Sequence, residues 1–216
     1  MRRTTFSVLA ALLSLSTTVN ATTISFATDP FDGSTALTTP GRQIVGGEPS
    51  ISFSIASDVF AFDPSVFGVG NLVLFANDFV GNLPTSNVNV VVLQTLDNDS
   101  DPVTPFGAGN AANLIAAQIT SPSPGFFIYF NSGLDLPRLV YSTDLSENTA
   151  DLKILARMTN LTGQNGRNAL PTFTASNFVM ISGPSSIPEP SLLSLMAAPA
   201  ALWGCAHILR RRRVRC

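Results

Sequence analysis

Apolar residues at every second position, in short segments, are the feature that most limits what this chain can fold into. A period of two places successive side chains on opposite faces of a β-strand, so each such segment predicts a short strand. The clearest alternation falls in residues 24–26, 51–55, 60–62, 72–74 and 88–93. Residues 125–132, 138–142 and 172–181 are rich in the aromatic and β-branched residues that strands favour.

Two segments break this alternation and predict short helices. One covers residues 111–119, and the other covers residues 150–161, where Leu152, Leu155 and Ala156 share one helical face. Many short strands with one or two short helices predict a mainly β fold, in the form of an antiparallel β-sandwich or jelly roll. We expect this fold in a single exported domain that spans residues 22–182.

Charge is distributed unevenly along the chain. The 216 residues together carry a net charge of −2. Residues 22–187 hold five basic and thirteen acidic residues, which gives this segment a net charge of −8. An acidic domain repels the phosphate backbone of DNA and RNA, so no nucleic-acid partner is expected.

The N-terminus has the three parts of a secretory signal peptide. Arg2 and Arg3 precede an apolar stretch over residues 6–15, and small and polar residues follow it. The sequence Val-Asn-Ala before Thr22 fits a cleavage site. We therefore expect residues 1–21 to form the signal peptide and signal peptidase to cut between Ala21 and Thr22.

The C-terminus has the composition of a membrane anchor. Residues 191–209 contain no charged side chain when His207 is neutral. As a helix they span about 28 Å, which is close to the hydrocarbon thickness of a bilayer, so they predict one transmembrane helix. Residues 210–216 are then a basic cytoplasmic tail, because positive flanks stay inside. Its stop-transfer signal consists of Arg210, Arg211, Arg212 and Arg213.

A short motif stands directly before this apolar segment. Pro188, Glu189 and Pro190 end a linker over residues 183–190, in which two prolines hold the backbone extended. The order Pro-Glu-Pro, apolar segment and arginine cluster resembles the PEP-CTERM sorting tail of exported bacterial proteins. The resemblance is confined to the C-terminal tail and says nothing direct about the domain before it.

The resemblance implies how the chain is processed and where it works. Exosortase, a membrane-embedded cysteine transpeptidase, would recognise Pro188, Glu189 and Pro190 and cut near them. A membrane-anchored precursor, already exported across the cytoplasmic membrane, would become a protein of the cell surface or the extracellular space. The implied setting is the exopolysaccharide or biofilm layer.

The sequence argues against several kinds of catalytic site. His207 is the only histidine, and both cysteines, Cys205 and Cys216, also lie in the tail. The exported domain therefore has no Ser-His-Asp or Cys-His machinery, no disulfide and no zinc-thiolate site. Phenylalanine dominates the aromatic residues, with Phe 15 against Tyr 2 and Trp 1, which is typical of core packing.

Three alternating carboxylates, Asp97, Asp99 and Asp101, follow the strand predicted at residues 88–93. Carboxylates spaced in this way can converge on Ca²⁺, which takes several oxygen ligands. Pro102 and Ala108 stand where an EF-hand has glycine and glutamate, so the loop is not an EF-hand. Two structures fit this pattern: a calcium site, and a polar turn in which the Asp and Asn side chains hydrogen-bond to nearby backbone groups. No other cofactor is expected.

Two functions from different classes remain open. The first is a non-enzymatic binding or structural protein of the extracellular polysaccharide layer. The second is a carboxylate-dependent glycosidase or lyase of jelly-roll type that acts on the same layer, because glycoside hydrolysis needs only two acids at a set separation. We favour the first, since no motif pairs any two acids of the domain.

Overall fold

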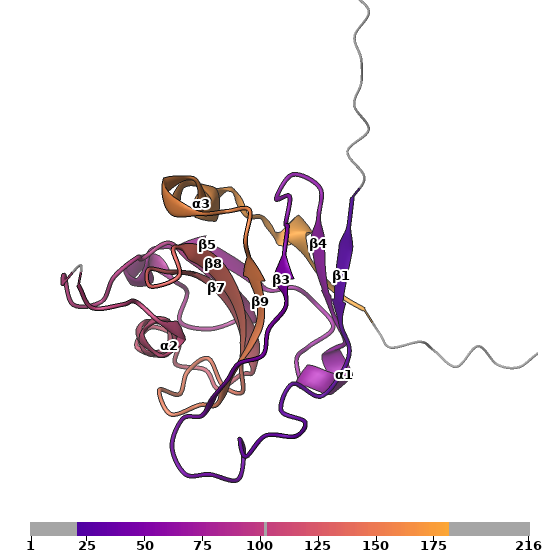
Figure 1. Cartoon of the computed structure of the whole chain (residues 1–216). Coiled ribbons are helices and arrows are strands. Elements are labelled where there is room, and N and C mark those ends of the chain that lie inside the picture. The colour runs from indigo at the N-terminus through magenta and orange to yellow at the C-terminus, as the bar shows by residue number, and fades with distance from the viewer. Residues whose placement is uncertain (1–20, 102, 182–216) are drawn as a thin grey trace, which may run out of the picture. The chain divides into compact units, whose positions relative to one another are not determined.

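A computed structural model describes residues 21–101 and 103–181 of the chain. These residues form a larger and a smaller β-sheet with short helices around them (Figure 1). Residues 1–20 of the predicted signal peptide (residues 1–21) lie outside the described residues. So do the predicted linker with Pro188, Glu189 and Pro190, the transmembrane helix and the arginine tail. Among the described residues, no helix has the length and apolar character needed to cross a membrane.

The larger sheet has seven strands. Their order is β2–β9–β8–β7–β6–β5, and β3 also pairs with β9. β7 and β9 both run antiparallel to β8, and the other pairs of this sheet are parallel. The strands are β2 (Ile44–Val45), β3 (Ser50–Ile51), β5 (Phe75–Asp78), β6 (Val90–Leu93), β7 (Gly125–Asn131), β8 (Leu136–Ser142) and β9 (Leu152–Met158).

The smaller sheet has three parallel strands in the order β1–β4–β10. They are β1 (Thr23–Phe26), β4 (Val59–Phe62) and β10 (Phe178–Met180). The first and last strands of the described chain therefore flank the same central strand. Three α-helices are described, α1 (Pro64–Phe67), α2 (Ala108–Ala116) and α3 (Gly163–Ala169), with 3₁₀ turns at Val80–Asn82, Leu170–Thr172 and Ala175–Asn177.

The mainly β fold with few short helices is confirmed, but the predicted antiparallel pairing is wrong for most strand pairs. A jelly roll or an antiparallel sandwich requires antiparallel neighbours on both sides of its inner strands, and among the described strands β8 alone has them. β6 is buried at every position, as is typical of central parallel strands covered on both faces. The connection from β6 to β7 passes through α2, a crossover of the length that parallel pairing needs.

One predicted helix is confirmed and the other is wrong. Residues 111–119 overlap α2, whereas residues 150–161 contain strand β9. Leu139 pairs with Ala156 and Val140 with Ile154, so Leu155 is an extra residue that bulges from β9. The bulge interrupts the period of two, and the resulting apolar spacing imitates one face of a helix.

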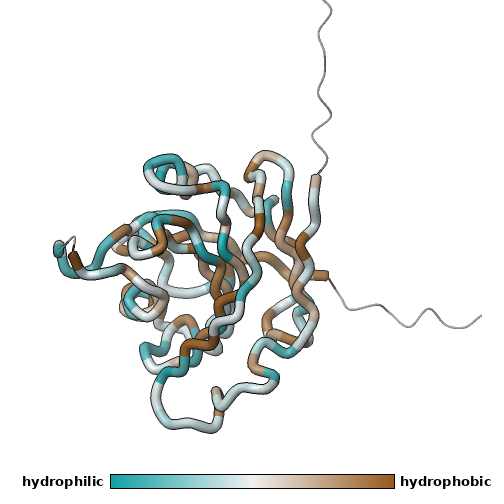
Figure 2. Tube along the Cα trace, viewed as in Figure 1, coloured by the Kyte–Doolittle hydropathy of each residue, from teal (hydrophilic) through white to brown (hydrophobic). Residues whose placement is uncertain are grey.

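The central strands divide the interior into two cores. Phe126 and Ile128 of β7 pack against the smaller sheet, whereas Phe127 and Tyr129 face the core that includes α2. Hydrophobic residues are concentrated along these central strands (Figure 2). Phe62 of β4 stacks on Phe126 with ring centroids 3.7 Å apart, which joins the two sheets directly.

Gly125, at the start of β7, has no space for a side chain. A Cβ there would lie 2.5 Å from Leu145 Cδ1 and 2.7 Å from the Asn89 carbonyl oxygen. We expect Gly125→Ala to lower the free energy of unfolding by about 1–3 kcal/mol through overpacking, measured by urea denaturation. Gly70→Ala is the matched control, because a Cβ there meets nothing within 4 Å. Equal losses in the two variants would contradict this packing.

Candidate functional site

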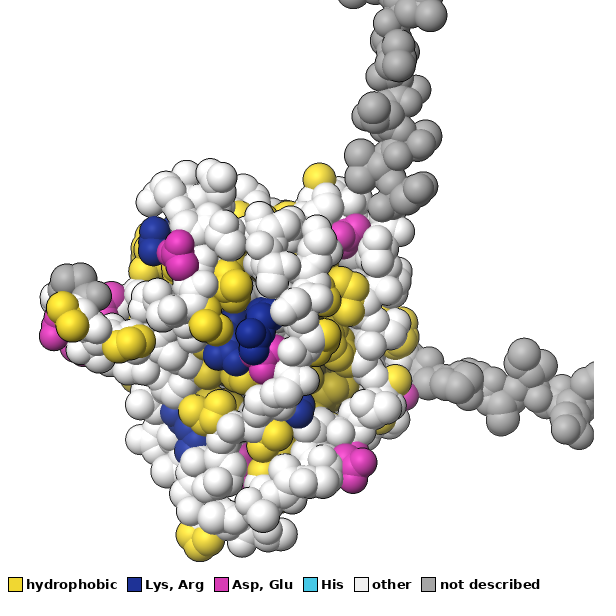
Figure 3. All heavy atoms as spheres, in the orientation of Figure 1, with side chains coloured by type: hydrophobic (Ala, Val, Ile, Leu, Met, Phe, Trp, Pro, Cys, Tyr) yellow, Lys and Arg dark blue, Asp and Glu magenta, His cyan; other side chains and the backbone are white. Residues whose placement is uncertain are grey.

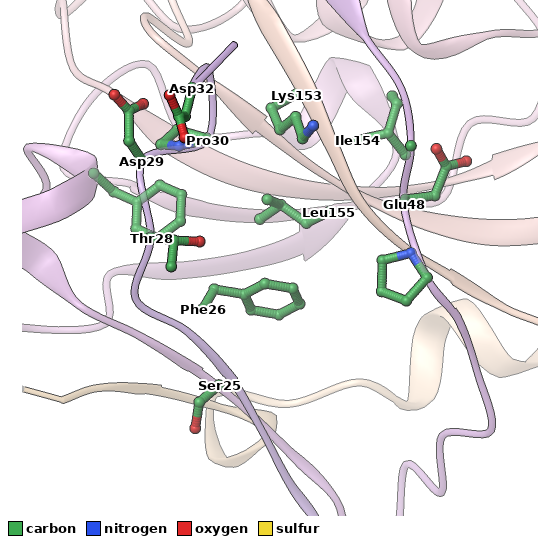
Figure 4. A pocket seen from close by; sticks show the side chains of 13 residues that line it. Ser25, Phe26, Thr28, Asp29, Pro30, Asp32, Glu48, Lys153, Ile154 and Leu155 are labelled. Atoms are coloured by element: carbon green, nitrogen blue, oxygen red, sulfur yellow. The ribbon is translucent and has the colours of Figure 1, made fainter.

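An open groove of about 360 Å³ lies between β9 and the segment that follows β1 (Figure 4). The loop between β2 and β3 forms part of its far side. The groove is lined by Ser25, Phe26, Thr28, Asp29, Pro30, Asp32, Gly47, Glu48, Pro49, Phe67, Lys153, Ile154 and Leu155. Four parts of the chain, residues 25–32, 47–49, 67 and 153–155, therefore build one site.

Apolar side chains form the floor of this groove. Phe26 is half-buried, and its ring stacks on Phe62 of the neighbouring strand with centroids 5.6 Å apart and planes 16° apart. Leu155, the bulged residue of β9, lies beside Phe26 in the groove (Figure 4). The floor is thus a fixed apolar surface, of the kind that packs against the non-polar face of a ligand ring.

Two exposed carboxylates, those of Asp29 and Asp32, stand on one wall of the groove (Figure 4). Both belong to the turn after β1, in which the Phe31 amide donates to Asp29 Oδ1 at 2.9 Å. Each ionised carboxylate accepts hydrogen bonds through two oxygens. This wall therefore offers several acceptors to ligand hydroxyl groups.

Lys153 of β9 supplies a cation on the other side. Its Nζ donates to the Gly46 carbonyl oxygen at 2.8 Å, which holds the side chain in place. An ammonium group has three hydrogens to donate, so this bond leaves donors for a ligand. Acceptors and donors thus face the groove from different elements.

A buried ion cluster supports the loop at the far side of the groove. The Glu48 carboxylate is 1% exposed and accepts from Arg157 Nη2 at 2.9 Å and from Arg138. Burial by itself would raise the pKa of Glu48, but its own backbone amide and the hydrogen bonds and charges of the two arginines outweigh burial and lower the pKa. Basic side chains gather near the middle of this face, with an acidic side chain against them (Figure 3).

Tyr141, close to the floor of the groove, has a neutral phenol. Its hydroxyl donates to the Phe67 carbonyl oxygen at 2.8 Å. Burial, together with the negative charge of Asp29, raises the pKa of Tyr141 to about 12. This phenol therefore cannot act as a base near neutral pH.

The acids that line the groove come from two different segments of the chain. The two acids of a glycosidase flank the scissile bond from different sides. Asp29 and Asp32 instead belong to a single turn, in which the Asp32 amide lies 3.5 Å from the Asp29 carbonyl oxygen. The opposite side of the groove carries Lys153 and Glu48, and the Glu48 carboxylate is already paired with Arg138 and Arg157.

The predicted calcium residues lie in an exposed loop, away from this groove. Asp97 accepts the amide hydrogen of Asp99, Asp99 that of Asp101, and Asp101 that of Val103. Within residues 21–101 and 103–181, no group of three or more metal-ligating side chains converges. Asp97 and Asp101 share a pocket of about 220 Å³ with Arg167. The positive charge of Arg167 disfavours binding of a metal cation in that pocket.

The calcium site itself stays a prediction. A folded-state ligand raises thermal stability, so calcium should raise Tm in wild-type protein and have no effect in Asp99→Asn. Identical melting of wild-type protein in calcium and in chelator would contradict the site.

The predicted signal cleavage site lies at the edge of the described chain. Ala21 and Thr22 are both exposed, and β1 begins at the next residue. The groove residues were not singled out from the sequence, because Asp29, Glu48 and Lys153 lie far apart along the chain. The only local signal was the Asp-Pro-Phe-Asp-Gly turn directly after the first strand.

Comparisons of the chain with protein-family models, with curated proteins and with solved structures find no match.

Proposed function

We propose that this chain is the precursor of an exported, non-enzymatic protein that binds polysaccharide outside the cell. The groove is the observation that carries the proposal. It combines an apolar floor at Phe26 with acceptors at Asp29 and Asp32 and a donor at Lys153. A sugar ring has the complementary surfaces, namely a face of C–H groups and a rim of hydroxyls.

The proposal includes removal of both ends of the chain. Signal peptidase removes residues 1–21, and exosortase cuts near Pro188, Glu189 and Pro190 after the apolar segment anchors the precursor. The position of β1 agrees with the first cut, because this strand begins at Thr23, directly after the proposed first residue of the mature chain. The processed domain then remains at the cell surface or in the extracellular matrix.

The experiment is a binding measurement with exopolysaccharide purified from the host. Asp29→Asn removes the charge and one acceptor position from the groove wall. We expect a loss of affinity of about ten-fold, equivalent to about 1.4 kcal/mol, by isothermal titration calorimetry. Glu147→Gln, at an exposed acid outside the groove, is the matched control and should bind like wild-type protein. Equal affinity of all three proteins would contradict the groove as the binding site.

The same samples test the enzymatic alternative. Wild-type protein should release no reducing ends or unsaturated sugars from the polysaccharide. Turnover by wild-type protein that Asp29→Asn abolishes would replace the binding function with a carboxylate-dependent glycosidase or lyase.

A further inference from the structure

Asp58, directly before β4, is a buried carboxylate held by uncharged donors. Its residue is 5% exposed. Oδ1 accepts from the Thr22 amide at 2.9 Å and from the Ser57 hydroxyl at 3.2 Å, and Oδ2 accepts from the Ser54 amide at 2.8 Å. Among the described residues, the ion pairs involve Glu48 and Asp135, so no basic side chain there balances Asp58.

The backbone nitrogen that contacts Asp58 belongs to the bond predicted for signal cleavage. Thr22 is held from both sides, because its carbonyl oxygen also accepts the Val59 amide hydrogen at 2.9 Å. These two contacts fix the first residue after the cleavage site against the start of β4. Cleavage before Thr22 would change the chemistry of this nitrogen without moving it.

We propose that Asp58 is the binding site for the α-ammonium group that forms when signal peptidase cuts between Ala21 and Thr22. The inference rests on the export and signal cleavage in the proposed function. Hydrolysis breaks the bond between the Ala21 carbonyl carbon and the Thr22 nitrogen, and water supplies the hydroxyl that completes the Ala21 carboxyl group. The nitrogen takes up protons from water and becomes an ammonium group at neutral pH, because an α-amino pKa is ordinarily about 7.7–8.0.

Cleavage thereby places the positively charged α-ammonium group of Thr22 next to the buried Asp58 carboxylate. Burial by itself would raise the pKa of Asp58, but the hydrogen bonds from Ser54, Thr22 and Ser57 outweigh burial and lower it, so the carboxylate is ionised at neutral pH. A charge-assisted bond from an ammonium group is stronger than one from a neutral amide. The ion pair in turn raises the pKa of the α-amino group in the folded protein. Its contribution to stability is complete below the ordinary α-amino pKa and is lost as pH rises through the raised value.

The consequence reaches the groove through β1. Thr22 is followed at once by this edge strand of the smaller sheet, whose last residue is Phe26. Anchoring Thr22 on Asp58 therefore fixes the start of the strand that carries the groove floor. The mature protein would therefore hold β1 and the groove floor more firmly than the precursor does.

The test uses the full precursor, expressed with its own signal peptide and recovered from its host after export. N-terminal sequencing identifies the first residue, and mass spectrometry then follows acylation of the α-amino group near pH 8. Three proteins are compared: wild type, Asp58→Asn, and a variant with one alanine inserted between Ala21 and Thr22. The inserted alanine keeps Asp58 but moves the new ammonium away from it. Lys153, the single lysine of the chain, is the internal control in each sample.

We expect the wild-type α-amino group to react about five-fold more slowly near pH 8 than in either variant, which corresponds to a pKa raised by about one unit. Lys153 should react equally in all three. Should Asp58→Asn fail to fold, the insertion variant alone decides. Equal reaction rates would overturn the ion pair while leaving export intact. A mature chain that begins at another residue would overturn the cleavage position and this inference, whereas the groove is tested separately by Asp29→Asn.

Discussion

Phe62→Ala is expected to lower the free energy of unfolding by about 3–5 kcal/mol, the usual loss for a phenylalanine deleted from a packed core. Phe62 has no exposed surface and stacks on Phe126 of the other sheet at 3.7 Å between ring centroids. It also stacks on Phe26 of the groove floor. Removing its ring leaves a cavity where the two sheets meet, so both the sheet contact and the groove floor lose support.

Urea denaturation monitored by circular dichroism measures this loss. Phe79→Ala is the matched control, because Phe79 is 56% exposed and the same atoms are removed from the surface. We expect the control to change stability by about 0.5 kcal/mol or less. Similar losses in the two variants would show that the contact between the sheets contributes little.

Glu48→Gln should cost about 3 kcal/mol, because it removes the charge of a nearly buried carboxylate that two partly buried arginines share. Arg138 and Arg157 are directly paired across β8 and β9, and like charges in that position repel each other. The Glu48 carboxylate accepts from both arginines and is itself almost completely buried. Its loss should also release the loop between β2 and β3 that borders the groove.

The effect of this substitution depends on pH in a defined direction. The folded-state pKa of Glu48 is lowered below 4.5, so its contribution to stability is complete above that value and is lost as pH falls through the folded pKa. The difference between wild type and Glu48→Gln should therefore shrink in acid. Asp135→Asn is the control, since the Asp135–Arg167 pair is exposed and should contribute about 1 kcal/mol or less. A stability difference that does not change with pH would contradict the role of the Glu48 charge.

The sequence predicted individual strands better than their pairing. β1, β4, β6, β7 and β8 overlap segments identified by alternation or by aromatic and β-branched content. Parallel pairing depends on which distant segments meet, and period-two patterning carries no information about strand direction. The continuous apolar run of β6, in contrast to alternation, is typical of a central parallel strand.

The groove could not be predicted for a similar reason. Its floor at Phe26, its acidic turn at Asp29 and its cation at Lys153 come from the two sheets and the connections between them. Leu155 reaches the groove because β9 contains a bulge at this residue. The bulge breaks the alternation of apolar residues, so the sequence of this strand has the apolar spacing of a helix. Long-range pairing creates the site, so no local motif marks it.

We propose that this chain is a precursor whose two ends are removed from a folded β domain that acts outside the cell. Intact mass and terminal sequencing of the protein, recovered separately from host membranes and medium, test it most directly. We expect an extracellular form that begins at Thr22 and ends near Pro188, Glu189 and Pro190. Recovery of the protein only in membranes, with Cys216 still present, would contradict it.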